Sequence, residues 1–518
     1  LPDPSPAQKV VFSMTLGPRA TTPWRTVTHG SALALIACFA APGLHAQGQG
    51  PSVTHRCAHG CSHHTSASKI RARGIAPLRV FAGDAPTLLL SIAQDALRVD
   101  PVRALEASRA LARHKRASEA MRLRGKVALG NAWRTLGKVA RAIAIADDVL
   151  ARLDRKELAV RGEARATLAA EAHALRIRCS LRSGDFAQAL RDARKAERAL
   201  GLGDPTLRAA HAAALYRNQH FREAADGYWK ILEGEPFHVE ALIRLGSGLL
   251  DAQPAPVGPL LERAVAENER GQHDRARVSL VRALGRRVDH PIALRVLGEI
   301  AIAKERRASA LVRGGFFARY FEAIDPGCDV APWTKRFFPD YKALGVDRRR
   351  VLRASARPFG TTLLSVLAKG GSHDLLASTE RTTDAASRAW LRGTRTFDGR
   401  VWDDVRGIGG LCAATGVEAL DEAHEGGFQT LVHELAHQLH FHAMTPAKKA
   451  RVDALYAAAK RHGRCLDYYA ASNAAEYFAQ GFEAWYSLVK APGQPITHGH
   501  TRFELERRDP ELATFIRS

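Results

Sequence analysis

Four histidines and one glutamate fall within the twelve residues LVHELAHQLHFH, at positions 431–442 of a 518-residue chain that contains only 22 histidines. His433, Glu434 and His437 form an H-E-x-x-H pattern. On a helix, residues four apart lie one turn apart on the same face, so the two imidazoles can reach one zinc ion with the glutamate as a base beside it. The alternative interpretation is an ordinary helix that carries histidines on its exposed face.

The apolar residues of this segment favour a helix that packs its other face into a core. At about 100° per residue, His437 falls about 40° from His433, and Glu434 falls about 100° from it. The opposite side holds Phe428, Leu431, Val432, Leu435 and Leu439. We therefore expect an apolar back and a histidine front.

Two histidines are an incomplete catalytic zinc site, because such a site usually has three protein ligands and one position for water. His440 lies on the same face, but about 10 Å of helix rise separates it from His433. We expect His440 to line the cleft rather than to bind metal. The metzincin pattern is excluded, because it requires Gly and His where this chain has His440 and Ala443.

A second amphipathic helix is predicted within YAASNAAEYFAQGFEAWYSLV, residues 469–489. Glu476, Gln480 and Glu483 share one face at helical spacing, and aromatic residues occupy the other. Glu476 is thus a candidate third ligand. The alternative is that Glu476 only closes a capping box with Asn473, three residues before it.

The combination of HELAH with Y-x6-E-x2-A, an Asn three residues before the Glu and aromatics just after it, resembles the catalytic domain of anthrax lethal factor and its relatives, including secreted Pro-Pro endopeptidases. The resemblance is strong over residues 428–485 and loose over roughly the last 190 residues. It implies a gluzincin, a zinc metalloendopeptidase of α+β zincin-type fold. In this chain it implies His433, His437 and Glu476 as zinc ligands, Glu434 as general base and Tyr469 as a tyrosine facing the metal.

Three further residues are expected around the ligands: Gln480, Asn473 and His440. Gln480 stands where the relatives carry a carboxylate that orients a ligand. This departure keeps a second hypothesis open, a protein-interaction scaffold with an inactive peptidase-like domain. A third, non-enzymatic binding of anionic polymers, rests on charge alone.

The implied chemistry is amide hydrolysis. Zinc lowers the pKa of a bound water toward about 7 and polarises the scissile carbonyl, while Glu434 takes the proton and delivers it to the leaving amine. Upstream, residues 401–420 combine glycine turns with β-branched residues and predict a hairpin, whose edge strand could bind a peptide substrate by strand addition. A plain connecting loop is the alternative.

The N-terminal residues predict an exported protein. Residues 1–46 are interpreted as a secretory signal peptide with an upstream extension, in which Met14 would begin a signal of normal length. The destination is the bacterial periplasm or the exterior, and lipidation of Cys38 is the alternative fate. Residues 47–84, rich in His, Cys, Gly and Ser, are predicted to be a flexible linker. Export permits disulfides, whose pairing stays open among Cys57, Cys61, Cys179, Cys328, Cys412 and Cys465.

Residues 85–312 predict stacked helical hairpins. Four segments each indicate the start of a hairpin's second helix: LGKVARAI, SGDFAQAL, NQHFREAA and RGQHDRAR. Each has an alanine where the two helices approach: Ala142, Ala189, Ala224 and Ala276. Residues 205–238 resemble the tetratricopeptide repeat, and the irregular spacing of the copies predicts a degenerate array. Such arrays provide binding surfaces without catalytic groups. A generic helical bundle is the alternative.

The expected fold is therefore mainly α, with a TPR-like solenoid followed by the peptidase domain at 325–518. The net charge of +23 is unevenly spread, because residues 321–518 carry 26 Lys plus Arg against 24 Asp plus Glu, and residues 1–320 carry 50 against 29. We expect a protein or peptide substrate, and a protein partner or an anionic surface at the basic repeats. No nucleic-acid module is visible, and no apolar run after the N-terminus predicts a transmembrane span.

Overall fold

The structure is a computed structural model that describes residues 85–97, 100–155, 160–247, 257–312, 316–325, 332–396, 399–490 and 500–518. The predicted signal peptide at 1–46 and the linker at 47–84 lie outside the described residues. In the described part the protein is mainly α, as predicted, with one small sheet. No helix there has both the length and the apolar character needed to cross a membrane.

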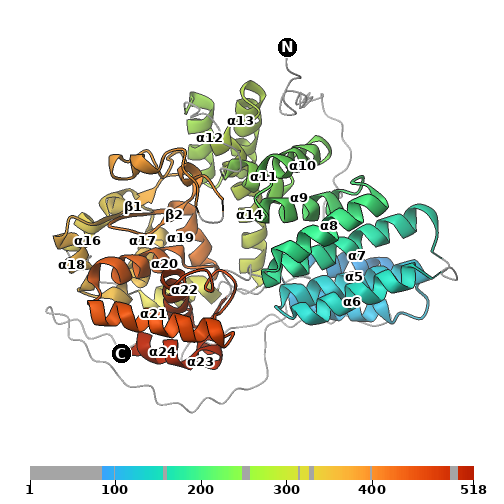
Figure 1. Cartoon of the computed structure of the whole chain (residues 1–518). Coiled ribbons are helices and arrows are strands. Elements are labelled where there is room, and N and C mark those ends of the chain that lie inside the picture. The colour runs from blue at the N-terminus through green and yellow to red at the C-terminus, as the bar shows by residue number, and fades with distance from the viewer. Residues whose placement is uncertain are drawn as a thin grey trace.

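The N-terminal half consists of helices packed as successive pairs, which form a curved array in Figure 1. They are α3 (Pro86–Asp95), α4 (Pro101–Ala112), α5 (Glu119–Thr135), α6 (Val139–Leu153), α7 (Gly162–Ser183), α8 (Phe186–Leu200), α9 (Pro205–Arg217), α10 (Phe221–Gly234), α11 (Val239–Gly246), α12 (Pro259–Glu269), α13 (His273–Arg286) and α14 (Pro291–Val312).

Four turns within this array follow the predicted pattern. Each has one residue with a left-handed backbone, at φ angles of 75°, 82°, 65° and 72°: Gly137, Gly184, Gln219 and Gly271. Glycine adopts this conformation without steric cost, which accounts for three of the four positions. At the fourth, the side chain of Gln219 makes the left-handed backbone strained. The alanine five residues later is fully buried in every case: Ala142, Ala189, Ala224 and Ala276. The predicted helix starts and close helix packing are confirmed.

The C-terminal half surrounds a three-stranded sheet with helices. The helices are α15 (Phe316–Ile324), α16 (Pro332–Phe337), α17 (Val346–Ala356), α18 (Thr362–Ala368), α19 (Val417–His424), α20 (Thr430–Gln438), α21 (Pro446–Arg461), α22 (Ala474–Tyr486), α23 (Arg502–Arg508) and α24 (Pro510–Arg517). The strands are β1 (Ser372–Leu376), β2 (Gly407–Ile408) and β3 (Cys412–Gly416). Their order is β1-β3-β2, with β1 parallel and β2 antiparallel to β3.

The predicted hairpin at 401–420 is present but shorter. Strands β2 and β3 pair through Gly407 with Thr415 and Ile408 with Ala414, and β2 lies at the edge of the described sheet. Residues 417–420 instead begin helix α19, which the sequence analysis missed. Val417 and Leu420 are both buried, and their spacing of three places them on one helical face.

Helix α20 occupies the centre of this half and contacts α17, α19, α22, β2 and β3. Its last residue, Gln438, joins it to the sheet through a fully buried hydrogen-bond network. The Gln438 amide donates to the carbonyls of Ser372 and Leu411, and its oxygen lies 2.9 Å from Nδ1 of His373. Nε2 of His373 lies 2.9 Å from the Thr415 hydroxyl. Burial lowers the pKa of His373 to about 4, so this ring stays neutral at pH 7.

Candidate metal centre

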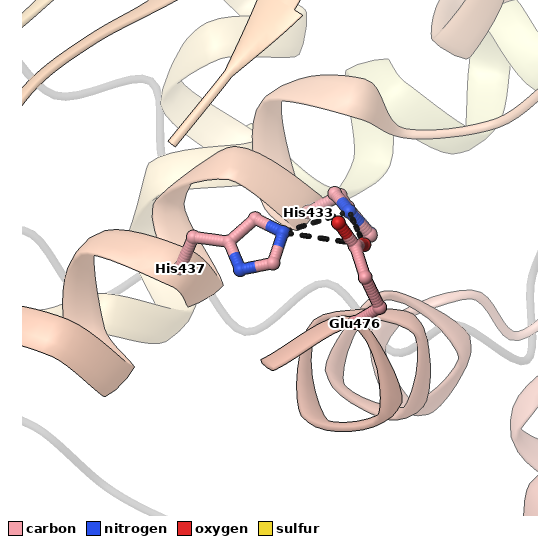
Figure 2. Close-up of side chains that lie close together, drawn as sticks. All are labelled: His433, His437 and Glu476. Atoms are coloured by element: carbon pink, nitrogen blue, oxygen red, sulfur yellow. Dashed lines mark hydrogen bonds and ion pairs between the residues drawn. The ribbon is translucent and has the colours of Figure 1, made fainter. Parts of the chain in front are cut away.

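Three side chains converge between helices α20 and α22, as Figure 2 shows. Nε2 of His433 lies 3.1 Å from Nε2 of His437 and 3.1 Å from Oε2 of Glu476. Nε2 of His437 lies 3.4 Å from the same carboxylate oxygen. These three side chains form a group that could hold a metal ion.

The spacing of the three donor atoms fits one zinc ion. Imidazole nitrogens and carboxylate oxygens lie about 2.0–2.2 Å from zinc, so two ligands at a tetrahedral angle are about 3.3 Å apart. The three separations, 3.1, 3.1 and 3.4 Å, are close to that value. Two imidazoles and one carboxylate are also a donor set found in catalytic zinc sites.

The N-terminus of α22 aims Glu476 at the histidines. Oδ1 of Asn473 accepts a hydrogen bond from the Glu476 backbone N–H at 2.9 Å, so Asn473 is the N-cap of α22. The Glu476 carboxylate does not return to Asn473 but points to His433 and His437. Only half of the alternative capping box is therefore formed.

The local charges stabilise an ionised Glu476. Burial alone would raise the pKa of this carboxyl, but the hydrogen bonds and charges of His433 and His437 lower it well below its usual range. Burial disfavours a charged His433, yet Glu476 raises the pKa of that ring above its usual value. In the described part of the chain, Nδ1 of each of the two histidines is buried without a hydrogen-bond partner.

Glu434 is buried beside the three candidate ligands. Burial raises the pKa of its carboxyl, as a general base that works near neutral pH requires. Strand β2 passes directly over it, because a Cβ atom on Gly407 would lie 2.7 Å from Oε1 of Glu434. A Cβ atom on Gly409 would lie 2.5 Å from Cβ of His437. Glycine is thus required at Gly409, where the residues after β2 meet helix α20.

No family model, curated protein or solved structure matches this chain. The observation that supports a metal centre is the close spacing of His433, His437 and Glu476 in the structure.

The two neighbouring tyrosines have different surroundings. Tyr469 is half-buried in the turn before α22, where its N–H donates to Oδ1 of Asp467 at 3.0 Å and its carbonyl accepts from the Ser472 hydroxyl. Tyr468 turns to the helical array, with its ring centroid 5.0 Å from that of Phe186 in an edge-to-face contact. Tyr469 is thus held at the start of α22, whereas Tyr468 is held by the helical array.

The remaining predicted neighbours lie outside the three-ligand group. Gln480 is buried one turn beyond Glu476 on α22. His440 is buried within a π-helical turn at Leu439–Ala443, where its ring packs 5.5 Å from Phe478. The π-turn was not predicted. It places Phe441 parallel to the His437 ring at 5.7 Å, and π-turns often occur at functional sites.

A second glutamate, Glu483, holds helix α20 in place. The sequence analysis noted Glu483 only for its position on one face of its helix. The fully buried Glu483 carboxylate accepts from the Gln429 backbone N–H at 3.0 Å, at the N-cap of α20. It also accepts from the Ser487 hydroxyl and pairs with Lys490. A negative charge at a helix N-terminus stabilises the helix, so Glu483 fixes α20 against α22. The sequence signal for this role is the spacing of seven residues between Glu476 and Glu483, which places both side chains on one face of the helix.

Proposed function

We propose that this protein is an exported zinc metallopeptidase of the gluzincin class. The observation that carries the proposal is the set of three donor atoms, from His433, His437 and Glu476, at the mutual spacing of zinc ligands beside the buried Glu434. When bound, zinc would polarise a peptide carbonyl and acidify a water molecule.

The chain's own residues would then move the proton and hold the substrate. Glu434 accepts the proton of the attacking water and donates it to the leaving amine, and its burial, which raises its pKa, suits both roles. Tyr469 donates its phenolic hydrogen to the carbonyl oxygen as negative charge develops there. A neutral phenol stabilises that charge without adding one of its own.

Strand β2 is the proposed platform for the substrate backbone. Its Gly407–Ile408 segment pairs with β3 on one side and lies at the edge of the described sheet, directly over Glu434. Gly409, which follows β2, lies over His437. An extended peptide that adds to this edge would place a backbone carbonyl next to the ligands. The stacked helical pairs are proposed to be a TPR-like array that recruits the substrate or a partner protein.

A catalytically inactive scaffold is the second candidate. It is favoured by Gln480, a buried amide on the ligand helix where the resembled enzymes carry a carboxylate. Orienting partners of metal ligands typically contribute 10- to 100-fold in metal affinity or activity. An inactive scaffold would bind peptides without hydrolysing them.

The deciding experiment compares the wild type with Glu434→Gln on a library of quenched fluorescent peptides. We expect the wild type to hydrolyse a subset of peptides and to lose this activity with a zinc chelator. Glu434→Gln should retain zinc, because Glu434 is not a ligand, and should show no hydrolysis. A zinc-loaded wild type that cleaves no peptide would favour the scaffold, and equal cleavage by Glu434→Gln would refute the role of that residue.

A further inference from the structure

A chain of three fully buried polar side chains links helix α20 to the sheet. Gln438 is the last residue of α20 and directly follows His437. His373 lies on β1, and Thr415 lies on β3. These two side chains are on the same side of the sheet, because His373 pairs with Ala413 and Thr415 is two residues farther along β3. We call Gln438, His373 and Thr415 the polar bridge.

The hydrogen bonds of the polar bridge are satisfied by one arrangement of donors and acceptors. The Gln438 amide nitrogen donates both of its hydrogens, to the carbonyls of Ser372 at 3.0 Å and Leu411 at 3.1 Å. The Gln438 oxygen therefore accepts from Nδ1 of His373, 2.9 Å away. Because the His373 ring is neutral at pH 7, its Nε2 accepts from the Thr415 hydroxyl, also 2.9 Å away.

The Thr415 end of the polar bridge lies opposite the strand that covers the candidate general base. On β2, the residue paired with Thr415 is Gly407. A Cβ atom on Gly407 would lie 2.7 Å from Oε1 of Glu434, so the backbone of Gly407 passes close to that carboxylate. Because β2 and β3 are joined by backbone hydrogen bonds, a contact that holds Thr415 also holds the strand next to Glu434.

The Gln438 end of the polar bridge holds the turn that covers a candidate ligand. Leu411, whose carbonyl accepts from the Gln438 amide, lies two residues after Gly409 in the turn between β2 and β3. A Cβ atom on Gly409 would lie 2.5 Å from Cβ of His437. The Gln438 amide therefore fixes the distance between this turn and helix α20 one residue beyond His437.

Stability alone does not account for polar side chains at these three positions. Apolar side chains of similar volume often pack a buried site as stably as a satisfied polar network does, because no polar group then loses its water. A satisfied network adds one defined arrangement, since a displacement leaves a buried donor or acceptor without a partner. A metal centre requires such precision, because its ligands must keep their geometry to within about 0.5 Å.

We propose that Gln438, His373 and Thr415 are positioning residues of the metal centre, which fix the β2–β3 hairpin over helix α20. This inference rests on the zinc site of the proposed function and adds the residues that hold that site in its geometry. The three side chains act through the backbone of the hairpin and through the position of α20, not as ligands. They are held by contacts with both strands that flank the hairpin turn and with β1.

The test separates position from stability by replacing the whole polar bridge with apolar residues. The full-length variant carries Gln438→Met, His373→Leu and Thr415→Val, which nearly conserve side-chain volume. We expect its thermal unfolding midpoint without zinc to lie within about 4 °C of that of the wild type. Its zinc affinity, measured by competition with a chelating dye, should fall about 10- to 100-fold, as it does when orienting partners of metal ligands are removed. An unchanged zinc affinity would overturn the proposal.

Single substitutions decide the question if the triple variant does not fold. His373→Gln can donate from its amide nitrogen to Gln438 and accept from Thr415 with its oxygen, so it should retain most of the zinc affinity. His373→Leu forms neither bond and should lose at least about tenfold. Thr383→Val is the matched control for Thr415→Val, because it removes another fully buried hydroxyl, which donates to Asp403 at 2.6 Å, and should leave zinc affinity unchanged. Equal zinc affinity in the two His373 variants, or in the two Thr→Val variants, would overturn the proposal.

Hydrogen exchange of the zinc-free, full-length protein separates this inference from the proposed function. The backbone amides of residues 407–415 should exchange faster in the polar-bridge variants than in the wild type, and at the wild-type rate in Thr383→Val. If the wild type binds no zinc but this difference is seen, the proposed function fails and the positioning of the hairpin stands. If the wild type binds zinc and the variants change neither exchange nor affinity, the zinc site stands and the role of the polar bridge is refuted.

Discussion

At the scale of single residues, the candidate centre depends on one carboxylate that crosses from α22 to α20. Oε2 of Glu476 lies within 3.4 Å of both histidine Nε2 atoms, and its backbone is held by the Asn473 cap. We expect Glu476→Ala to weaken zinc binding by more than about 100-fold, because it removes a ligand rather than an orienting partner. Asn473→Ala is the matched control. It should cost about 1 kcal/mol of stability and leave zinc stoichiometric.

Metal analysis after dialysis against a weak chelator would measure both variants. Full zinc occupancy in Glu476→Ala would contradict the assignment of the third ligand. Loss of zinc in Asn473→Ala at a temperature where it is folded would show that the cap, not the carboxylate, decides binding.

The two adjacent tyrosines allow a second prediction at this scale. If Tyr469 stabilises the developing charge on the carbonyl oxygen, Tyr469→Phe should lower kcat about ten- to a thousand-fold, with KM and zinc content little changed. Tyr468→Phe keeps the ring that packs on Phe186 and should leave kcat unchanged. Steady-state kinetics on any cleavable peptide would decide. The same loss of kcat in Tyr468→Phe would mean that the wrong tyrosine was chosen.

At the scale of elements, the close approach to α20 of the residues that follow β2 predicts that Gly409 tolerates no side chain. A Cβ atom there would lie 2.5 Å from His437 Cβ, so either the segment after β2 or helix α20 must shift. We expect Gly409→Ala to destabilise the protein by about 1–3 kcal/mol and to weaken zinc binding. Gly345→Ala is the control, because its Cβ would meet nothing within 4 Å. Thermal unfolding and zinc titration that do not distinguish the two variants would contradict the observed packing.

The turn that carries Tyr469 predicts a pH effect. Asp467 accepts the N–H of Tyr469 and lies 3.2 Å from Nε2 of His500. Burial opposes a charged His500, but its hydrogen bonds to Asp467 and Glu504 raise its pKa to about 9. Because the pKa of an unfolded His is about 6.5, the charged ring stabilises the fold fully below pH 6.5. This stability, at most about 3 kcal/mol, is lost as pH rises through about 9.

Urea unfolding at pH 6 and at pH 9.5, followed in the wild type and in His500→Gln, would measure this contribution. The wild type should lose stability between these pH values by more than His500→Gln does. An equal change in both proteins would show that His500 is not the group that titrates.

At the scale of the whole molecule, periodic patterns were predictable and contacts between distant segments were not. Helix starts after Gly137, Gly184 and Gly271 follow from local glycine conformation and alanine spacing, so the sequence encodes them within a few residues. The packing of Tyr468 on Phe186 joins segments far apart in the chain, and no local pattern encodes it. The His373 and Gln438 network was missed for the same reason.

The same distinction applies to the candidate site. The spacing of His433 and His437 is local, so their convergence could be predicted, and the resemblance implied Glu476. The approach of Gly407 to Glu434 and the π-turn that moves Phe441 over His437 depend on how the sheet and helices pack. The described cysteines, Cys179, Cys412 and Cys465, are free thiols, and Cys57, Cys61 and Cys328 lie outside the described residues.

The central claim is that this chain holds one zinc ion between α20 and α22. The most direct measurement is anomalous diffraction on either side of the zinc absorption edge from crystals of the full chain grown with equimolar zinc. We predict a single strong anomalous peak about 2.0–2.2 Å from Nε2 of His433, Nε2 of His437 and a carboxylate oxygen of Glu476. A zinc peak at other residues, or no peak among these three side chains, would contradict the account.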